Sequence, residues 1–263
     1  MALEFFDANA CFGTETVNHE VVNHERFIVL EKVDTAPDAK CLLDYMDHAG
    51  IKKALVRHSS MYETDPTYGN QLIIEAIKGC EDRLIPSWTM LPCITDTQYR
   101  PGIFFERMKH NGVKVLRAYP EKDRFFLNGI TMKEQLDLLC ELKIPLYLEP
   151  REGFEIIYAV LKEFPKLIVV LCNTGFWPSA RYIYPLLKTY ENFYFETGDF
   201  GMLRGYEEIC STYGSEHILF GTNFPTNNMG CSMYHLMRAN ISDDSRQNIA
   251  CGNLERLLSE VRL

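Results

Sequence analysis

Short runs of apolar and β-branched residues recur along the chain, separated by longer segments in which apolar residues follow helical spacing. The short runs have the length and composition of buried strands. In one of the longer segments, Leu136, Leu139 and Cys140 fall on one helix face, as expected for a helix that lies on a sheet. Eight runs predict strands, at Leu3–Ala8, Lys53–Arg57, Leu84–Met90, Val113–Ala118, Ile144–Leu148, Leu167–Cys172, Phe193–Glu196 and Ile218–Gly221.

The alternation of eight predicted strands with helical segments indicates the fold class. Parallel strands need long crossover connections, which helices supply. Eight strand–helix repeats in one chain favour a parallel (β/α)8 barrel, the TIM barrel, over an open sheet. At 263 residues the chain has the usual size of one such barrel. We therefore predict a single α/β domain over 1–263, with a long loop or hairpin over 14–34 and a C-terminal helix over 240–263.

Residues typical of helix boundaries flank several of the helical segments. The most specific signal is the capping box of Thr131 and Glu134, in which each side chain can bond the backbone N–H group of the other. Further starts are predicted near Pro37 and at Pro178 with Ser179. Four glycines mark predicted helix ends, at Gly50, Gly79, Gly112 and Gly214.

The charge of the chain restricts its partners. The formal net charge is −9, and no cluster of Lys and Arg with interleaved aromatic residues occurs. Phosphate backbones are bound by basic surfaces that release counterions, so a nucleic-acid partner is not expected. An anionic membrane surface is disfavoured for the same reason. The sequence leaves open whether the chain forms homo-oligomers.

The N-terminal segment and the cysteines indicate a cytoplasmic protein. The first residues lack the basic and long apolar regions of a secretory signal, and no apolar stretch of about 18 residues occurs. The nine cysteines form no Cys-x-x-Cys pair, and most lie on apolar periodic segments. We expect buried thiols in a reducing compartment.

The residues at the strand ends are the candidates for chemistry, because the active sites of such barrels lie at the C-terminal face. Side chains two residues apart on a strand share a face. On the first strand this places Asp7, Asn9 and Cys11 together on the inward face. The same argument turns Glu149, Asn173 and Asn223 inward from the fifth, sixth and eighth strands, so that all of these side chains converge on one mouth.

Several strand-end segments carry a family signature. His217 to Pro225 reads HILFGTNFP, and Phe6 to Gly13 reads FDANACFG. Together with five further segments, in the same order along the chain, they resemble the amidohydrolase-2 branch of the amidohydrolase superfamily, which comprises TIM-barrel metal-dependent hydrolases, decarboxylases and lactonases. The other matching segments are Leu146–Pro150 with Leu171–Gly175, and more weakly Arg83–Pro86, Gly112–Arg117 and Gly252–Leu257.

The resemblance implies a degenerate metal site. Asn9 and Cys11 stand where the family has its two first-strand histidines, Glu149 and Asn173 stand in place of the next two, and Asn223 replaces the strand-8 aspartate. Carboxamides are poor ligands for transition metals, and a thiolate with one carboxylate would bind weakly. We expect no tightly bound metal ion and no other cofactor.

The histidines offer no substitute metal site. His48, His110, His217 and His235 lie on helices, at helix ends or at strand starts, away from the mouth. His19 and His24 repeat at five-residue spacing in the loop after the first strand, which favours a solvated hairpin or lid over a ligand pair. Only His58, just after the second strand, is a candidate to face the mouth, where it would contribute to substrate binding.

Three arginines at strand ends are the second chemical feature. Arg57, Arg117 and Arg151 end or follow the second, fourth and fifth strands, and arginine captures carboxylate or phosphate groups with two parallel hydrogen bonds. The alternative is that each arginine pairs with a neighbouring loop acid, with Glu121, Glu152 and Asp199 as candidates. Aromatic residues that could wall the site, or serve only packing, are Tyr119, Trp177 and Phe224.

The favoured function is a hydrolase or lactonase that acts without a bound metal on a small anionic, carboxylated molecule. Certain lactonases of the resembled superfamily work without metal. Glu149 would be the general base, and Arg57 and Arg117 would orient the anion. Asn9, Asn173 and Asn223 would polarise a carbonyl group. The metal-free relatives keep the strand-8 aspartate as base, whereas this chain has Asn223.

Two alternatives remain open at this point. One is a catalytically inactive barrel that binds a small ligand or a partner through the same mouth, since a fold alone does not determine function. The other is a metal-dependent hydrolase with an atypical site, in which a divalent ion such as Zn²⁺ is held by Cys11, Glu149 and Asp199.

Overall fold

The computed structural model describes residues 3–13, 36–94, 97–150, 153–175 and 179–263. Its eight strands form one parallel sheet in which each strand pairs with the next along the chain. The sheet closes through backbone bonds from Ala8 N to Phe220 O at 2.7 Å and from Cys11 N to Phe224 O at 2.8 Å. The strands are β1 Phe6–Phe12, β2 Lys53–His58, β3 Leu84–Thr89, β4 Val115–Arg117, β5 Leu146–Leu148, β6 Val169–Leu171, β7 Phe193–Glu196 and β8 Ile218–Leu219.

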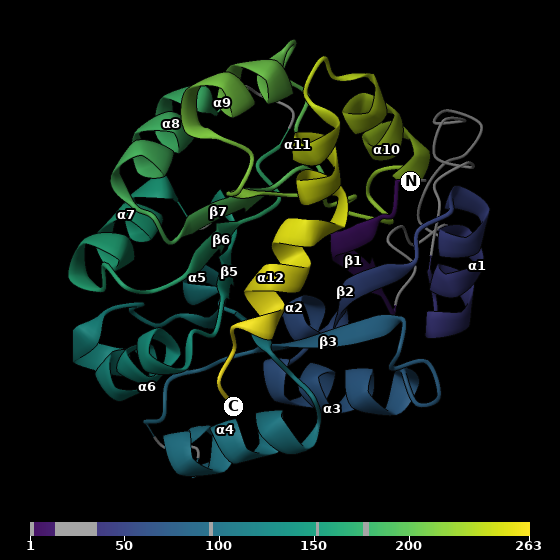
Figure 1. The fold of residues 1–263 in the computed structure, drawn as a ribbon. Coiled ribbons are helices and arrows are strands. Elements are labelled where there is room, and N and C mark those ends of the chain that lie inside the picture. Colours follow the sequence, from purple (N-terminus) through teal and green to yellow (C-terminus); the bar gives the residue numbers. More distant parts are fainter. Residues whose placement is uncertain (1–2, 14–35, 95–96, 151–152, 176–178) are drawn as a thin grey trace, which may run out of the picture.

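The helices surround this barrel as an outer ring (Figure 1). The predicted (β/α)8 TIM barrel is therefore confirmed. The helices are α1 Ala39–Ala49, α2 Ser60–Glu63, α3 Pro66–Ala76, α4 Pro101–His110, α5 Pro120–Asp123, α6 Gly129–Leu142, α7 Phe154–Glu163, α8 Ala180–Thr189, α9 Gly205–Tyr213, α10 Met229–Arg238, α11 Asp243–Gln247 and α12 Asn253–Ser259, with the 3₁₀ turn η2 Thr97–Tyr99 and the π turn η4 Asn248–Gly252.

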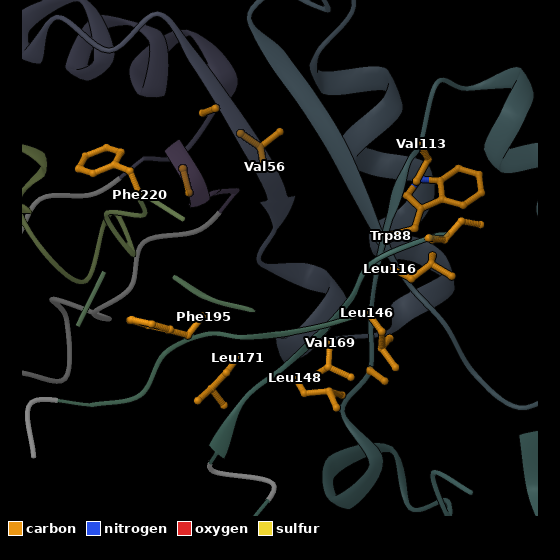
Figure 2. Packing of buried hydrophobic residues seen from close by; sticks show 14 of the residues in the cluster. Val56, Trp88, Val113, Leu116, Leu146, Leu148, Val169, Leu171, Phe195 and Phe220 are labelled. Atoms are coloured by element: carbon orange, nitrogen blue, oxygen red, sulfur yellow. The ribbon is translucent and has the colours of Figure 1, made fainter. Parts of the chain in front are cut away.

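The larger part of the core lies between the strands and the surrounding helices. Alternate strand residues such as Val56, Leu116, Leu146, Val169 and Phe195 point to this side and are completely buried (Figure 2). Apolar residues from the helices complete the same cluster. This layer ties each helix to its strands and leaves the other face of every strand to fill the barrel.

A smaller cluster fills the barrel from within and is covered by the C-terminal helix. Leu55, Val115, Val170 and Leu219 contribute from the strands, and α12 adds Leu254, Leu257 and Leu258. In Figure 1 this helix, drawn in yellow, crosses the barrel in front of the strands. Because Phe6 and Ile168, at the strand starts, belong to the same cluster, α12 closes the N-terminal end. The opposite, C-terminal end is left for polar side chains.

Some predicted boundaries are confirmed and one helix start is wrong. Gly50 and Gly214 end α1 and α9 with positive φ angles of 83° and 84°. The capping box at Thr131 does not start a helix. Instead, Asn128 caps α6 with an oxygen that accepts from the N–H groups of Ile130 and Thr131. An extended asparagine one turn earlier therefore supplies the cap.

The first strand differs from its prediction in bounds and in side-chain direction. It spans Phe6–Phe12 rather than Leu3–Ala8, and its register against β2 shifts between Asp7 and Ala10. Phe6 and Ala8 belong to the inner cluster, but Ala10 belongs to the outer one. The predicted shared face is thus wrong for Asp7, because a β-bulge interrupts the alternation of side chains, whereas Asn9 and Cys11 both lie toward Arg117.

The remaining segment predictions have mixed outcomes. The segment 240–263 contains α11, η4 and α12 instead of one helix. The predicted hairpin or lid over 14–34 lies outside the described residues, as do His19 and His24. All nine cysteines are free thiols. Of the helices that the structure describes, none is both long and apolar enough to cross a membrane.

Candidate active site at the barrel mouth

Polar side chains from five strands meet inside the C-terminal end of the barrel. Asn9 lies on β1, Arg117 ends β4, and Glu149 directly follows β5. Asn173 lies just beyond β6, and Glu196 ends β7. Arg117, Asn9 and Glu196 are 1% exposed and Glu149 is 2% exposed, so this cluster is screened from solvent. Charged groups at such depth must be paired or hydrogen-bonded.

The guanidinium of Arg117 contacts groups inside the barrel. Nε donates to Ser87 Oγ at 3.1 Å, and Nη2 donates to Asn9 Oδ1 at 3.1 Å. Nη1 lies 3.9 Å from Cys172 Sγ, and the guanidinium carbon lies 4.8 Å from the centre of the Tyr147 ring. The contacts hold the group flat against an aromatic face, which is a favourable arrangement for arginine.

Two carboxamides connect Arg117 to two carboxylates. Asn9 Nδ2 donates to Asn173 Oδ1 at 2.7 Å and to Glu196 Oε1 at 3.2 Å. Asn173 Nδ2 donates in turn to Glu149 Oε1 at 2.7 Å. Both amide hydrogens of Asn9 therefore have acceptors, whereas Asn173 uses one of its two among the described residues. The arrangement fixes the orientation of both amides, because the oxygen of Asn9 faces the guanidinium and the nitrogen faces the acids.

Glu196 is a site residue that the sequence analysis did not identify. Its Oε1 accepts from Asn173 N at 2.9 Å, and its Oε2 accepts from Gly198 N at 2.7 Å. Burial raises the pKa of Glu196 to about 7, although these backbone donors oppose the change. Its position could have indicated this role, because Glu196 alternates with Tyr194 on one face of the strand and ends a strand that was predicted with the correct bounds.

Asp7 lies behind the cluster and supports β8. Its Oδ1 accepts from the backbone N–H groups of Thr222 and Asn9, both at 2.9 Å, and its Oδ2 accepts from Thr222 Oγ1. Burial raises the pKa of Asp7 to about 6, while Thr222 and the charge of Arg117 act in the opposite direction. These bonds connect the first and last strands, so Asp7 acts as a structural group of barrel closure.

Asn223 belongs to a second polar group beside the mouth. It donates from Nδ2 to Asp199 Oδ1 at 3.1 Å, and Asn227 donates to the same oxygen at 2.6 Å. Asp199 Oδ2 accepts from Gly175 N at 3.1 Å. A cavity of about 320 Å³ adjoins this group and is also lined by His235.

Asn173 and Asn223 share a backbone conformation that explains part of their presence. Both have φ of 52°, the left-handed region that most side chains avoid. Asparagine tolerates this region better than nearly all non-glycine residues. The carboxamides at these two strand ends therefore have a conformational role in addition to their hydrogen bonds.

Arg57 and Tyr119 face the same mouth from β2 and from the residue after β4. The positive charge of Arg57 acts on Cys11, Tyr119 and Glu149, and its side chain is only partly buried. Tyr119 is 1% exposed and packs its ring edge-on against Tyr62 at 4.9 Å. Within the described ranges, Arg57 Nε and the Tyr119 hydroxyl have no hydrogen-bond partner. Burial raises the pKa of Tyr119, so its hydroxyl stays protonated and available as a donor.

His58 and Phe224, two further residues predicted at the mouth, lie apart from this network. His58 Nδ1 accepts from Ser60 N at 3.2 Å, and its ring packs edge-on against Phe12. Burial lowers the pKa of His58, which favours a neutral ring at the start of α2. Arg151 and Trp177, predicted to bind substrate, lie outside the described residues. Phe224 is buried and packs on Tyr45.

The donor set at the mouth does not fit a divalent metal ion. The oxygens of Asn9 and Asn173 already accept hydrogen bonds, and the nearest charge to Asn9 Oδ1 is a guanidinium. Among the residues that the structure describes, no group of three His, Cys, Asp or Glu side chains could hold a metal. That statement covers the alternative set of Cys11, Glu149 and Asp199.

Sequence comparison identifies the family model that this chain fits. A model described as amidohydrolase matches residues 105–259, more than half of the chain. The match includes the strand ends that carry Arg117, Glu149, Asn173 and Asn223. No curated protein matches the chain.

Solved structures with the same fold include enzymes that act on carboxylated molecules. An uncharacterised TIM-barrel protein from Bordetella bronchiseptica is 18% identical, with a TM-score of 0.72 over 98% of this chain and 99% of the other. A dihydroxybenzoic acid decarboxylase from Polaromonas, with bound manganese and 2-nitroresorcinol, is 15% identical, with a TM-score of 0.73 over 98% and 97%. A 4-oxalomesaconate hydratase from Rhodopseudomonas palustris is 12% identical, with a TM-score of 0.68 over 97% and 96%. At these identities the likeness establishes the fold alone.

Proposed function

Because the chain belongs to the amidohydrolase family, we propose that it is an enzyme that hydrolyses a small carboxylated molecule without a tightly bound metal ion. The observation that carries this proposal is Glu149. A carboxylate 2% exposed is held at the end of a barrel strand, with Oε1 fixed by Asn173 at 2.7 Å. It lies within the electrostatic influence of Arg57 and Tyr119. Such a placement suits a general base.

The substrate class follows from the charge at the mouth. Arg57 is partly exposed and its Nε has no hydrogen-bond partner within the described ranges, so it can pair with a carboxylate. The Tyr119 hydroxyl can donate to the same anion. Arg117 is committed to Ser87, Asn9 and Tyr147, and we assign it to positioning. Arg151 and Trp177, outside the described residues, stay predictions as substrate contacts. The names of the decarboxylase and hydratase neighbours support a carboxylated substrate.

The proposed reaction is a lactonase-type hydrolysis. Glu149 accepts a proton from a water molecule as the water oxygen attacks the ring carbonyl carbon. The carbonyl oxygen gains negative charge, and the unused amide hydrogens of Asn173 and Asn223 are the candidate donors to it. When the carbon–oxygen bond of the ring breaks, the leaving oxygen takes the proton from Glu149. Asn9 has no amide hydrogen to spare, so we assign it to positioning.

A non-catalytic barrel that binds a ligand is the second candidate. The hydrogen bonds inside the mouth favour this candidate, because the polar groups of Asn9, Asn173 and Glu196 already bond one another. In this case Arg57 and Tyr119 would bind the same carboxylated class, but Glu149 would serve only to hold Asn173.

Two measurements separate these candidates. A panel of small carboxylates and lactones is screened for an increase in melting temperature, since a ligand at a hundredfold excess over its dissociation constant stabilises by about 2.7 kcal/mol. Arg57→Met is expected to abolish the shift. The lactones that bind are then assayed for hydrolysis. Binding with no turnover of any lactone would support the second candidate.

Glu149→Gln tests the proposed base directly. The substitution keeps the acceptor for Asn173 and removes the ability to take up a proton. Hydrolysis should fall by about 10²- to 10⁴-fold, while the ligand-induced shift in melting temperature is retained. Glu141→Gln on the exposed face of α6 is the matched control and should leave turnover unchanged. Full turnover in Glu149→Gln would eliminate the mechanism.

A further inference from the structure

We propose that the guanidinium of Arg117 is the built-in cation of this barrel and takes the electrostatic place of a divalent metal ion. The manganese in the dihydroxybenzoic acid decarboxylase neighbour shows that this fold can hold a metal. In this chain a fixed side-chain charge would organise the mouth instead. The inference goes beyond the proposed function, because it concerns how the polar network is held together whether or not a substrate is turned over.

The position of the guanidinium is the first argument. Arg117 projects from β4, and its contacts come from four other strands or their ends. Asn9 belongs to β1, Ser87 to β3 and Tyr147 to β5, while Cys172 directly follows β6. In a barrel with strand order β1 to β8, these partners surround the centre. A group that touches all of them lies across the interior of the barrel.

The direction of the hydrogen bonds is the second argument. Starting from the guanidinium, each carboxamide accepts through its oxygen and donates through its nitrogen. Arg117 donates to Asn9, Asn9 donates to Asn173 and Glu196, and Asn173 donates to Glu149. A cation at one end and two carboxylates at the other polarise every bond in the same sense, which strengthens such chains.

The distribution of buried charge is the third argument. Asp7, Glu149 and Glu196 are each at most 2% exposed. No described ion pair joins Asp7 or Glu196 to a Lys or Arg side chain. The charge of Arg117 reaches Asp7 through space and reaches Glu196 through Asn9. Glu149 is also influenced by the charge of Arg57, whereas Asp7 and Glu196 depend on Arg117 for compensation at this depth.

The same network explains why a metal ion is excluded. A divalent ion would need the oxygens of Asn9 and Asn173 as ligands, but those oxygens already accept from Arg117 and Asn9. An ion near Asn9 would also meet the positive guanidinium. Removal of Arg117 should therefore free the oxygen of Asn9 and leave an acidic pocket with oxygen donors, which is the donor type that Mn²⁺ prefers.

The test compares Mn²⁺ binding by wild type, Arg117→Met and Arg117→Lys. Calorimetry and the melting temperature are measured with manganese chloride and with EDTA. We expect no saturable binding by the wild type or by Arg117→Lys, which keeps the charge. Arg117→Met should melt several degrees lower and should regain part of that loss on saturable binding of Mn²⁺. Arg83→Met, which removes a partly exposed arginine paired with Asp47, should show no such gain.

Two results would overturn the inference. One is saturable Mn²⁺ binding by the wild type, and the other is an Arg117→Met protein that gains none. If Arg117→Met is insoluble, its soluble yield with and without added manganese is the readout, and an unchanged yield counts against the inference. A negative result in the Mn²⁺ experiment leaves the Glu149→Gln assay unaffected. The proposal about Arg117 and the proposed hydrolysis are therefore tested separately.

Discussion

Individual residues at the mouth serve conformation and chemistry together. Asn173 occupies a left-handed backbone position, accepts from Asn9 through its side chain, donates to Glu149, and bonds Glu196 through its backbone N–H. A substitution there would change several contacts at once. Glu149 and Arg57 are better targets for functional tests, because each contributes one charge to the mouth.

The inward direction of Glu149 could be predicted from its strand parity with Tyr147. Asn173 shares parity with Leu171 of the outer cluster and turns inward through its left-handed backbone, which parity does not predict. The structure brings Asn9, Glu149 and Asn173 together. The direction of their hydrogen bonds could not be predicted, because an asparagine side chain is both donor and acceptor. Glu196 could not be identified from the resemblance, because it lies outside the short segments that resemble the family. The internal contacts of Arg117 could not be predicted either, because they depend on the burial of its side chain, which one sequence does not show.

The buried carboxylates predict a pH dependence of stability. The pKa of Glu196 rises from an ordinary value of 4.5 to about 7 in the folded protein, chiefly through burial. A raised folded-state pKa contributes stability below the unfolded value and loses it as the pH rises through the folded value. We expect the free energy of unfolding to fall by about 3 kcal/mol from this group between about pH 4.5 and pH 7.

Glu196→Gln isolates this contribution. Denaturant unfolding is measured in steps from about pH 5 to pH 8 for the wild type, for Glu196→Gln and for the surface control Glu141→Gln. The slope against pH should become flatter only in Glu196→Gln, whatever its absolute stability. An identical slope in all three proteins would contradict the assignment of Glu196 as a buried acid with a raised pKa.

At the scale of elements, the strands were predictable and the boundaries were less so. All eight predicted strands overlap observed ones, and Phe193–Glu196 has the predicted bounds, because buried parallel strands are short apolar runs. The bulge in β1 leaves no comparable pattern in the sequence and moved Asp7 away from the mouth. The start of α6 was misplaced because Asn128 and Thr131 are both competent caps.

The C-terminal helix has a definite mechanical role, since α12 closes the barrel end opposite to the mouth. Leu257→Ala removes a side chain that is 3% exposed and packs into the inner cluster. We expect the free energy of unfolding to fall by about 2 to 5 kcal/mol. Leu203→Ala, at a position 92% exposed, is the matched control and should change it by less than about 0.5 kcal/mol. Equal effects in urea titrations would show that α12 does not seal the barrel.

At the scale of the whole molecule, the fold and the family are established. The outer core of helix and strand residues is continuous around the barrel. The mouth retains the convergent geometry of an active site, with a guanidinium, carboxamides and carboxylates as its functional groups. Seven short segments in family order were enough to predict this architecture. They could not predict the substrate, because specificity depends on the side chains and loops around the mouth.

The central claim is that this barrel works without a resident metal, and elemental analysis tests it most directly. Protein purified without chelator should contain well under one equivalent of zinc, iron or manganese per chain. Treatment with EDTA should leave its melting temperature unchanged, because Arg117 supplies the central charge. A near-stoichiometric metal content, together with a melting temperature that falls in EDTA, would contradict the account.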